Sequence, residues 1–163
     1  MASKILLPGE RQRSEIVIQT RIGSPISNVQ EHDLPPRYLK LAEELDKKYH
    51  EPFVLFVNNP SPYYNCHGLT FGSRRSAISD PQEILKILEE DDYTLVEDKD
   101  VQKGDIIVYF GNDGDAEHSG LVIGERNGLP LILSKWGYGK EAVHTFSMCP
   151  YDSSTVRYYR ILK

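Results

Sequence analysis

The sequence predicts an α+β domain, with helices in its first half and an antiparallel sheet in its second half. Helix-like patterns occur before residue 93, whereas the chain beyond it consists of short apolar runs separated by turns. Asn127 and Gly128 lie between two such runs, which is a strong signal for a β-hairpin. The length of 163 residues suits a single hydrophobic core.

The N-terminal part of the chain has a different character from the rest. Residues 1–34 are polar and interrupted by prolines and glycines, so we expect a partly irregular extension. Its one alternating segment, residues 15–20, is a candidate edge strand. Residues 35–163 then form the predicted domain.

Helical signals occur at three places in the first half. Apolar residues recur at helical spacing over residues 37–49. A second helix is expected to begin at Cys66, and Asp80 with Pro81 is a favourable start for a third. The short apolar run 53–57 fits a helix or a strand equally well.

Apolar runs in the second half predict an antiparallel sheet of about five to six strands, on which the helices pack. The candidate strands are residues 94–97, 105–110, 118–124, 131–136, 142–146 and 156–162.

Composition and charge disfavour several classes of function. The net charge is −5 and no block of Lys and Arg occurs, so a nucleic-acid partner is not favoured. No apolar run approaches the ~20 residues of a membrane span, and the N-terminal apolar stretch is too short for a signal peptide. We therefore expect a protein that is cytoplasmic as synthesised, although export by a non-Sec route leaves no trace in a sequence.

Two cysteines, Cys66 and Cys149, make neither a disulfide framework nor a paired CxxC zinc site. A zinc site built from Cys66, His67, His118 and His144 has no recognisable ligand spacing, so we expect neither a metal nor another cofactor.

Cys66 is the candidate nucleophile. A thiol attacks as a thiolate, and the N-terminus of a helix lowers the pKa of a thiol placed there. The neighbouring residues Asn65, His67 and Gly68 are polar or small, unlike a core segment. The competing interpretation is a buried core cysteine, which is the commonest fate of a free cysteine.

His118 is the candidate general base, because it opens an apolar strand directly after a polar turn. His67 is adjacent to Cys66, and neighbouring helical residues do not face each other, so it is not assigned as the base. Together with Tyr64, His67 is a candidate oxyanion or cleft residue.

A third group usually orients the base, and the sequence leaves three candidates. A two-residue turn at 127–128 would pair residue 120 with Lys135, placing that side chain on the face of His118. A lysine cannot accept a bond from an imidazole but can bind a substrate carboxylate. A turn one residue longer would place Ser134 there instead, and His144 on the next strand is a further candidate.

These residues resemble the NlpC-type papain-like cysteine peptidase superfamily. Asn65-Cys66-His67-Gly68 resembles its nucleophile segment, residues 104–110 its Gly-Asp strand and residues 118–124 its base-bearing strand. The order of these segments also matches, although His67 stands where the family has a small polar residue. The resemblance covers about residues 60–137 and implies a papain-like fold for the predicted domain 35–163, with Cys66 as nucleophile and His118 as base.

The resemblance implies a cysteine peptidase or amidase that cleaves an amide bond, such as one in a cell-wall peptide, through a thioester. Its substrate would be a peptide or a protein. The alternatives are a deamidase, an acyltransferase or a bacterial toxin effector with an immunity-type partner, or a non-catalytic binding module that keeps the fold.

Overall fold

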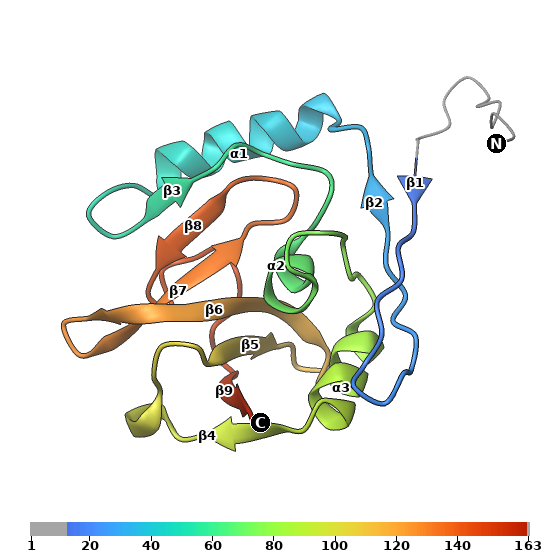
Figure 1. Ribbon diagram of the computed structural model, residues 1–163. Coiled ribbons are helices and arrows are strands. Elements are labelled where there is room, and N and C mark those ends of the chain that lie inside the picture. Colours follow the sequence, from blue (N-terminus) through green and yellow to red (C-terminus); the bar gives the residue numbers. More distant parts are fainter. Residues whose placement is uncertain (1–12, 163) are drawn as a thin grey trace, which may run out of the picture.

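The computed structural model describes residues 13–162 and confirms the α+β class. A seven-stranded sheet forms the centre of the molecule, with three helices and a small two-stranded sheet around it (Figure 1). Residues 1–12 of the predicted N-terminal extension lie outside the described residues.

All six predicted strands are present, and the ambiguous run 53–57 supplies a seventh. Each neighbouring pair in the sheet is antiparallel. The order across the sheet is β3 (Leu55–Val57), β8 (Glu141–His144), β7 (Leu129–Lys135), β6 (Ala116–Arg126), β5 (Ile106–Phe110), β9 (Val156–Ile161) and β4 (Tyr93–Val96). A short 3₁₀ turn, Asp98–Asp100, follows β4.

The three predicted helices are confirmed as α1 (Pro36–Lys48), α2 (Cys66–Gly72) and α3 (Pro81–Glu90). The Asp80 side chain accepts a hydrogen bond from the Gln82 N–H and caps α3, as its sequence position predicts. In Figure 1, α1 crosses above the β3–β8 side of the sheet and α3 lies toward β4 at the opposite side.

The predicted edge strand at residues 15–20 is wrong. The two-stranded sheet pairs β1 (Arg13–Ser14) with β2 (Gln30–Glu31) instead. Between them, the Asn28 side chain accepts from the Ile16 N–H and donates to the Ile16 carbonyl. Farther along the segment, the Ile18 carbonyl accepts from the Ile26 N–H and the Thr20 N–H donates to the Ser24 carbonyl, so the chain turns back on itself instead of forming an edge strand.

The core has two parts, one on each face of the sheet. Alternate residues of β5 belong to different parts: Ile106 and Val108 pack on one side, and Ile107 and Tyr109 on the other. The first part includes apolar residues of α3 and of the segment between β1 and β2. The second includes Trp136 and partly buried residues of α1.

A β-bulge decides which side chains share a face with His118. The hairpin has the predicted two-residue turn, but β6 carries an extra residue, Ile123, that lacks a partner on β7. The register therefore slips by one, and the placement of Lys135 on the His118 face is wrong. Ser134 takes that place, since a Cβ on Gly120 would come within 3.2 Å of the Ser134 Cβ.

Candidate active site

Cys66 is the first residue of α2, and the local sequence explains why the helix begins there. The Asn65 side chain accepts hydrogen bonds from the N–H groups of Gly68 and Ile78 and donates to the Ile78 carbonyl. Gly68 allows close packing, because a Cβ there would lie 2.0 Å from the Ser76 carbonyl oxygen. The start of α2 is thus held against the chain that follows it, and Cys66 is 6% exposed.

His118 lies on β6 and is fully buried. The Tyr151 ring stacks on its imidazole with 3.6 Å between ring centroids and 7° between planes, and the Tyr109 ring lies 5.0 Å away. Neither ring nitrogen of His118 has a hydrogen-bond partner among residues 13–162. A buried imidazole without a partner is rare, and such a group calls for an explanation.

The electrostatic interactions join Cys66 to two histidines. Burial opposes ionisation of the Cys66 thiol, but the charges of His67 and His118 outweigh it and lower the pKa well below its ordinary value. Burial lowers the pKa of His118, the Cys66 charge opposes this change, and His67 lowers the pKa further. The two predicted residues therefore lie close enough to influence each other's protonation.

His67 faces the junction between α2 and β6. Its Nδ1 lies 2.8 Å from Ser119 Oγ, and its Nε2 lies 3.0 Å from the Ala116 carbonyl oxygen. Both ring nitrogens are engaged, so the predicted oxyanion contact of His67 would require the loss of one of these bonds. Burial lowers its pKa, but the Cys66 charge and the bond to Ala116 outweigh this effect, and the pKa is raised.

The three candidates for a third member make other contacts. Trp136 Nε1 donates to Ser134 Oγ at 3.1 Å, and Ser134 Oγ lies 2.7 Å from His144 Nε2. His144 Nδ1 lies 2.7 Å from the Thr145 carbonyl oxygen and so donates to it. Neither Ser134 nor His144 hydrogen-bonds His118, so neither orients its ring directly.

Lys135 and Tyr64 are engaged in the structure that surrounds the site. The Lys135 ammonium donates to the carbonyl oxygens of Ser61, Gly137 and Gly139, which uses all three of its protons. Tyr64 Oη donates to Glu141, whose buried carboxylate also pairs with Arg74 and accepts from Asn58. Substrate contact by Lys135 and oxyanion donation by Tyr64 therefore both require loss of an existing bond.

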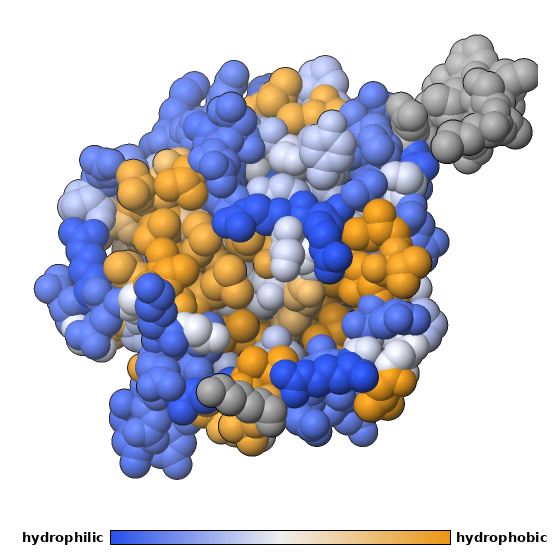
Figure 2. All heavy atoms as spheres, in the orientation of Figure 1, coloured by the Kyte–Doolittle hydropathy of each residue, from blue (hydrophilic) through white to orange (hydrophobic). Residues whose placement is uncertain are grey.

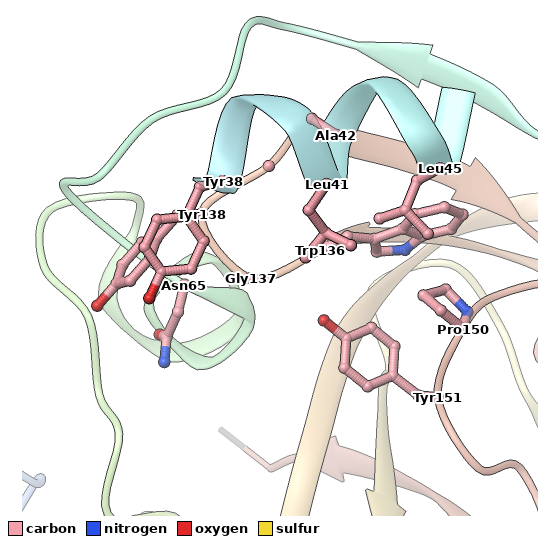
Figure 3. Close-up of a pocket in the computed structure, with 11 residues that line it drawn as sticks. Tyr38, Leu41, Ala42, Leu45, Asn65, Trp136, Gly137, Tyr138, Pro150 and Tyr151 are labelled. Atoms are coloured by element: carbon pink, nitrogen blue, oxygen red, sulfur yellow. The ribbon is translucent and has the colours of Figure 1, made fainter. Parts of the chain in front are cut away.

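A cavity of about 410 Å³ is lined by residues that carry no formal charge, and neither Cys66 nor His118 is among them (Figure 3). Asn65, which caps the nucleophile helix, and Tyr151, which stacks on His118, both line it. Figure 2 shows hydrophobic side chains gathered on the same side of the molecule, below α1 and over β7 and β8. The cavity lining comprises Tyr38, Leu41, Ala42, Leu45, Asn65, Trp136, Gly137, Tyr138, Gly139, Pro150 and Tyr151.

Sequence reasoning missed three residues that contact the site. Tyr151 stacks on His118, Ser119 contacts His67, and Thr70 bonds both Ser119 and the Cys66 carbonyl. Thr70 had a detectable signal, because it lies three residues after His67 and so on the same side of α2. Ser119 follows the candidate base directly, but its contact with α2 depends on helix packing. Tyr151 lies in the irregular segment between β8 and β9, where no periodicity indicates which way a side chain points.

Within residues 13–162, no group of three or more His, Cys, Asp or Glu side chains is arranged to hold a metal ion. No helix in the same part of the chain is long and apolar enough to cross a membrane. Comparisons with protein-family models, curated proteins and solved structures found no match to this chain.

Proposed function

We propose that the protein is a cysteine-nucleophile hydrolase that cleaves amide or ester bonds through a thioester, with Cys66 as nucleophile and His118 as general base. The observation that carries the proposal is the state of His118. Its imidazole is buried, neither nitrogen has a partner at hydrogen-bond distance among residues 13–162, and its interaction with Cys66 lowers the pKa of that thiol. In enzymes without bound substrate, catalytic hydrogen bonds are often loose and tighten when the substrate binds.

The chemistry follows the general pattern of nucleophilic catalysis. His118 takes the proton of Cys66 as the sulfur attacks the carbonyl carbon, and the carbonyl oxygen becomes an oxyanion. The backbone N–H groups of Cys66 and His67, in the first turn of α2, have no carbonyl partner inside the helix and are the proposed oxyanion donors, whereas the Gly68 N–H is bonded to Asn65. His118 then gives the proton to the leaving amine or alcohol. Water attacks the thioester, releases the acid and restores the thiol.

The cavity indicates which substrates to test. Its lining is apolar and aromatic and carries no formal charge, which favours an acyl group that is uncharged and hydrophobic. Tyr151 both lines the cavity and stacks on His118, so an acyl group in the cavity would contact the ring that covers the general base. The low exposure of Cys66 favours acyl transfer as the second candidate, because a site closed to water suits another acceptor.

Chromogenic esters and anilides with acetyl, hexanoyl, benzoyl and succinyl groups test this proposal. We expect hexanoyl or benzoyl substrates to be turned over faster than succinyl ones. Cys66→Ala should abolish turnover and His118→Ala should reduce it by about 10²–10⁴-fold. Cys149→Ala is the matched control, because that thiol is also buried but burial raises its pKa. Unchanged turnover in Cys66→Ala would remove the proposal, and adding an amine or alcohol acceptor separates transfer from hydrolysis.

A further inference from the structure

The contacts around His67 require a definite number of protons. Four hydrogen-bond contacts connect Thr70, Ser119 and His67 to their neighbours. Thr70 Oγ1 lies 3.0 Å from the Cys66 carbonyl oxygen, and Ser119 Oγ lies 2.9 Å from Thr70 Oγ1. The His67 nitrogens reach Ser119 Oγ at 2.8 Å and the Ala116 carbonyl oxygen at 3.0 Å.

Each hydrogen bond needs one proton, and a carbonyl oxygen supplies none. Thr70 and Ser119 supply one proton each, so the remaining two protons must come from His67. A neutral imidazole carries only one, and one of the four contacts would then bring two lone pairs together. Both ring nitrogens of His67 must therefore be protonated for the observed contacts to be hydrogen bonds.

We infer that His67 is held as a buried imidazolium and acts as a positioning residue, whose positive charge favours ionisation of Cys66 when His118, neutral at rest, takes the proton of that thiol. The catalytic meaning of this inference rests on the proposed function. Burial of an imidazolium is costly unless a negative charge lies nearby. The ionisable groups that act on His67 are Cys66 on its own helix and His118 on β6, and of these only Cys66 can become negative.

His144 provides an internal comparison, because its contacts are satisfied by a neutral ring. Trp136 supplies one proton, Ser134 a second, and the His144 Nδ1 a third, for three hydrogen bonds. Burial lowers the pKa of His144 to about 4, which agrees with this count. The raised pKa of His67 agrees with the opposite count at that residue. Two buried histidines of one protein thus carry different charges because their hydrogen-bond partners differ.

Nitrogen-edited NMR of the histidine rings tests the inference without substrate. We expect both ring nitrogens of His67 to carry protons at neutral pH, whereas His144 carries one there. The pH dependence of Cys66 alkylation by iodoacetamide, measured in a Cys149→Ala background, is the second readout. An imidazolium close to a thiolate lowers the thiol pKa by about 1–3 pH units, so His67→Gln should slow alkylation at pH 6 by tenfold or more.

Thr70 offers a test that touches neither charged group. Thr70→Val removes two of the four contacts and one proton, so the Ser119 hydroxyl is free to donate to a neutral His67. We expect the apparent pKa of Cys66 to rise in Thr70→Val and to stay unchanged in Thr70→Ser, which keeps the hydroxyl. Two results would overturn the inference: a His67 ring with one unprotonated nitrogen at pH 7, or the same pH dependence of Cys66 alkylation in Thr70→Val and wild type.

The outcomes also separate this inference from the proposed function. An acidic Cys66 beside a charged His67, with no turnover of any substrate, leaves the inference standing and removes the hydrolase. Cys66-dependent turnover with a neutral His67 keeps the hydrolase and removes the inference.

Discussion

Acid should destabilise the fold through His144, by an amount that its burial determines. The ring is fully buried, and burial lowers its pKa from 6.5 to about 4. As the pH falls below 6.5, the unfolded chain takes up the proton first, so folding loses stability until the folded ring also protonates near pH 4. Each unit of difference between the folded and unfolded pKa changes the free energy of unfolding by about 1.36 kcal/mol. The full loss is therefore about 3 kcal/mol, and none of it is present above pH 7.

Urea unfolding of wild type and His144→Gln, at intervals between pH 7 and pH 4.5, measures this loss. Gln cannot take up a proton, so the variant lacks this contribution, although it should lose about 1 kcal/mol at pH 7 with the bond to Thr145. Between pH 7 and pH 4.5 the free energy of unfolding of wild type should therefore fall by about 2–3 kcal/mol relative to that of His144→Gln, so that the variant becomes the more stable of the two. The exposed His50→Gln is the matched control and should follow wild type. Parallel curves for wild type and His144→Gln would refute the reasoning.

Three further substitutions test the surroundings of the site. Gly68→Ala should destabilise the protein by about 1–3 kcal/mol in thermal or urea unfolding, because its Cβ would meet the Ser76 carbonyl at 2.0 Å. Gly72→Ala is the control, since a Cβ there meets only ordinary contacts and should not destabilise the protein. Equal losses of stability in the two variants would contradict this packing. Tyr151→Ala should speed alkylation of the Cys66 thiol, because it removes the ring stacked on the general base. Tyr151→Phe keeps the ring and should be alkylated as fast as wild type. Equal alkylation rates in the two variants would mean that the ring does not restrict access to the thiol. Glu141→Gln should lower the free energy of unfolding by about 3 kcal/mol. Arginine, tyrosine and asparagine donors converge on the Glu141 carboxylate, and the amide nitrogen of Gln cannot accept hydrogen bonds from them. A loss below 1 kcal/mol would show that these bonds contribute little to stability.

Local signals were sufficient to predict most elements of the fold. Helical spacing and favourable start residues located α1 and α3, and the apolar runs located the strands from β4 to β9. The segment 15–20 has a strand-like pattern, but the Asn28 side chain bonds the Ile16 backbone and Ile18 pairs with Ile26, and a periodicity argument cannot detect that competition. The run at β3 was too short to distinguish a helix from a strand.

The candidate site was predicted only in outline. Cys66 and His118 each stood out from their immediate neighbours, and the fold brings them within electrostatic range. The groups around them depend on features that leave no local signal. The extra residue Ile123 places Ser134, instead of Lys135, on the face of the base, and the packing of α2 on β6 engages both nitrogens of His67.

The measurement that tests the central claim most directly is the location of the acyl group after a rapid quench. The protein is mixed with a hexanoyl p-nitrophenyl ester, stopped with acid during the first turnover and digested for mass spectrometry. We predict one acyl group on the peptide that contains Cys66, formed far more slowly in His118→Ala than in wild type. Rapid release of p-nitrophenol with no acyl group on Cys66, or equal acylation rates in His118→Ala and wild type, would contradict the account.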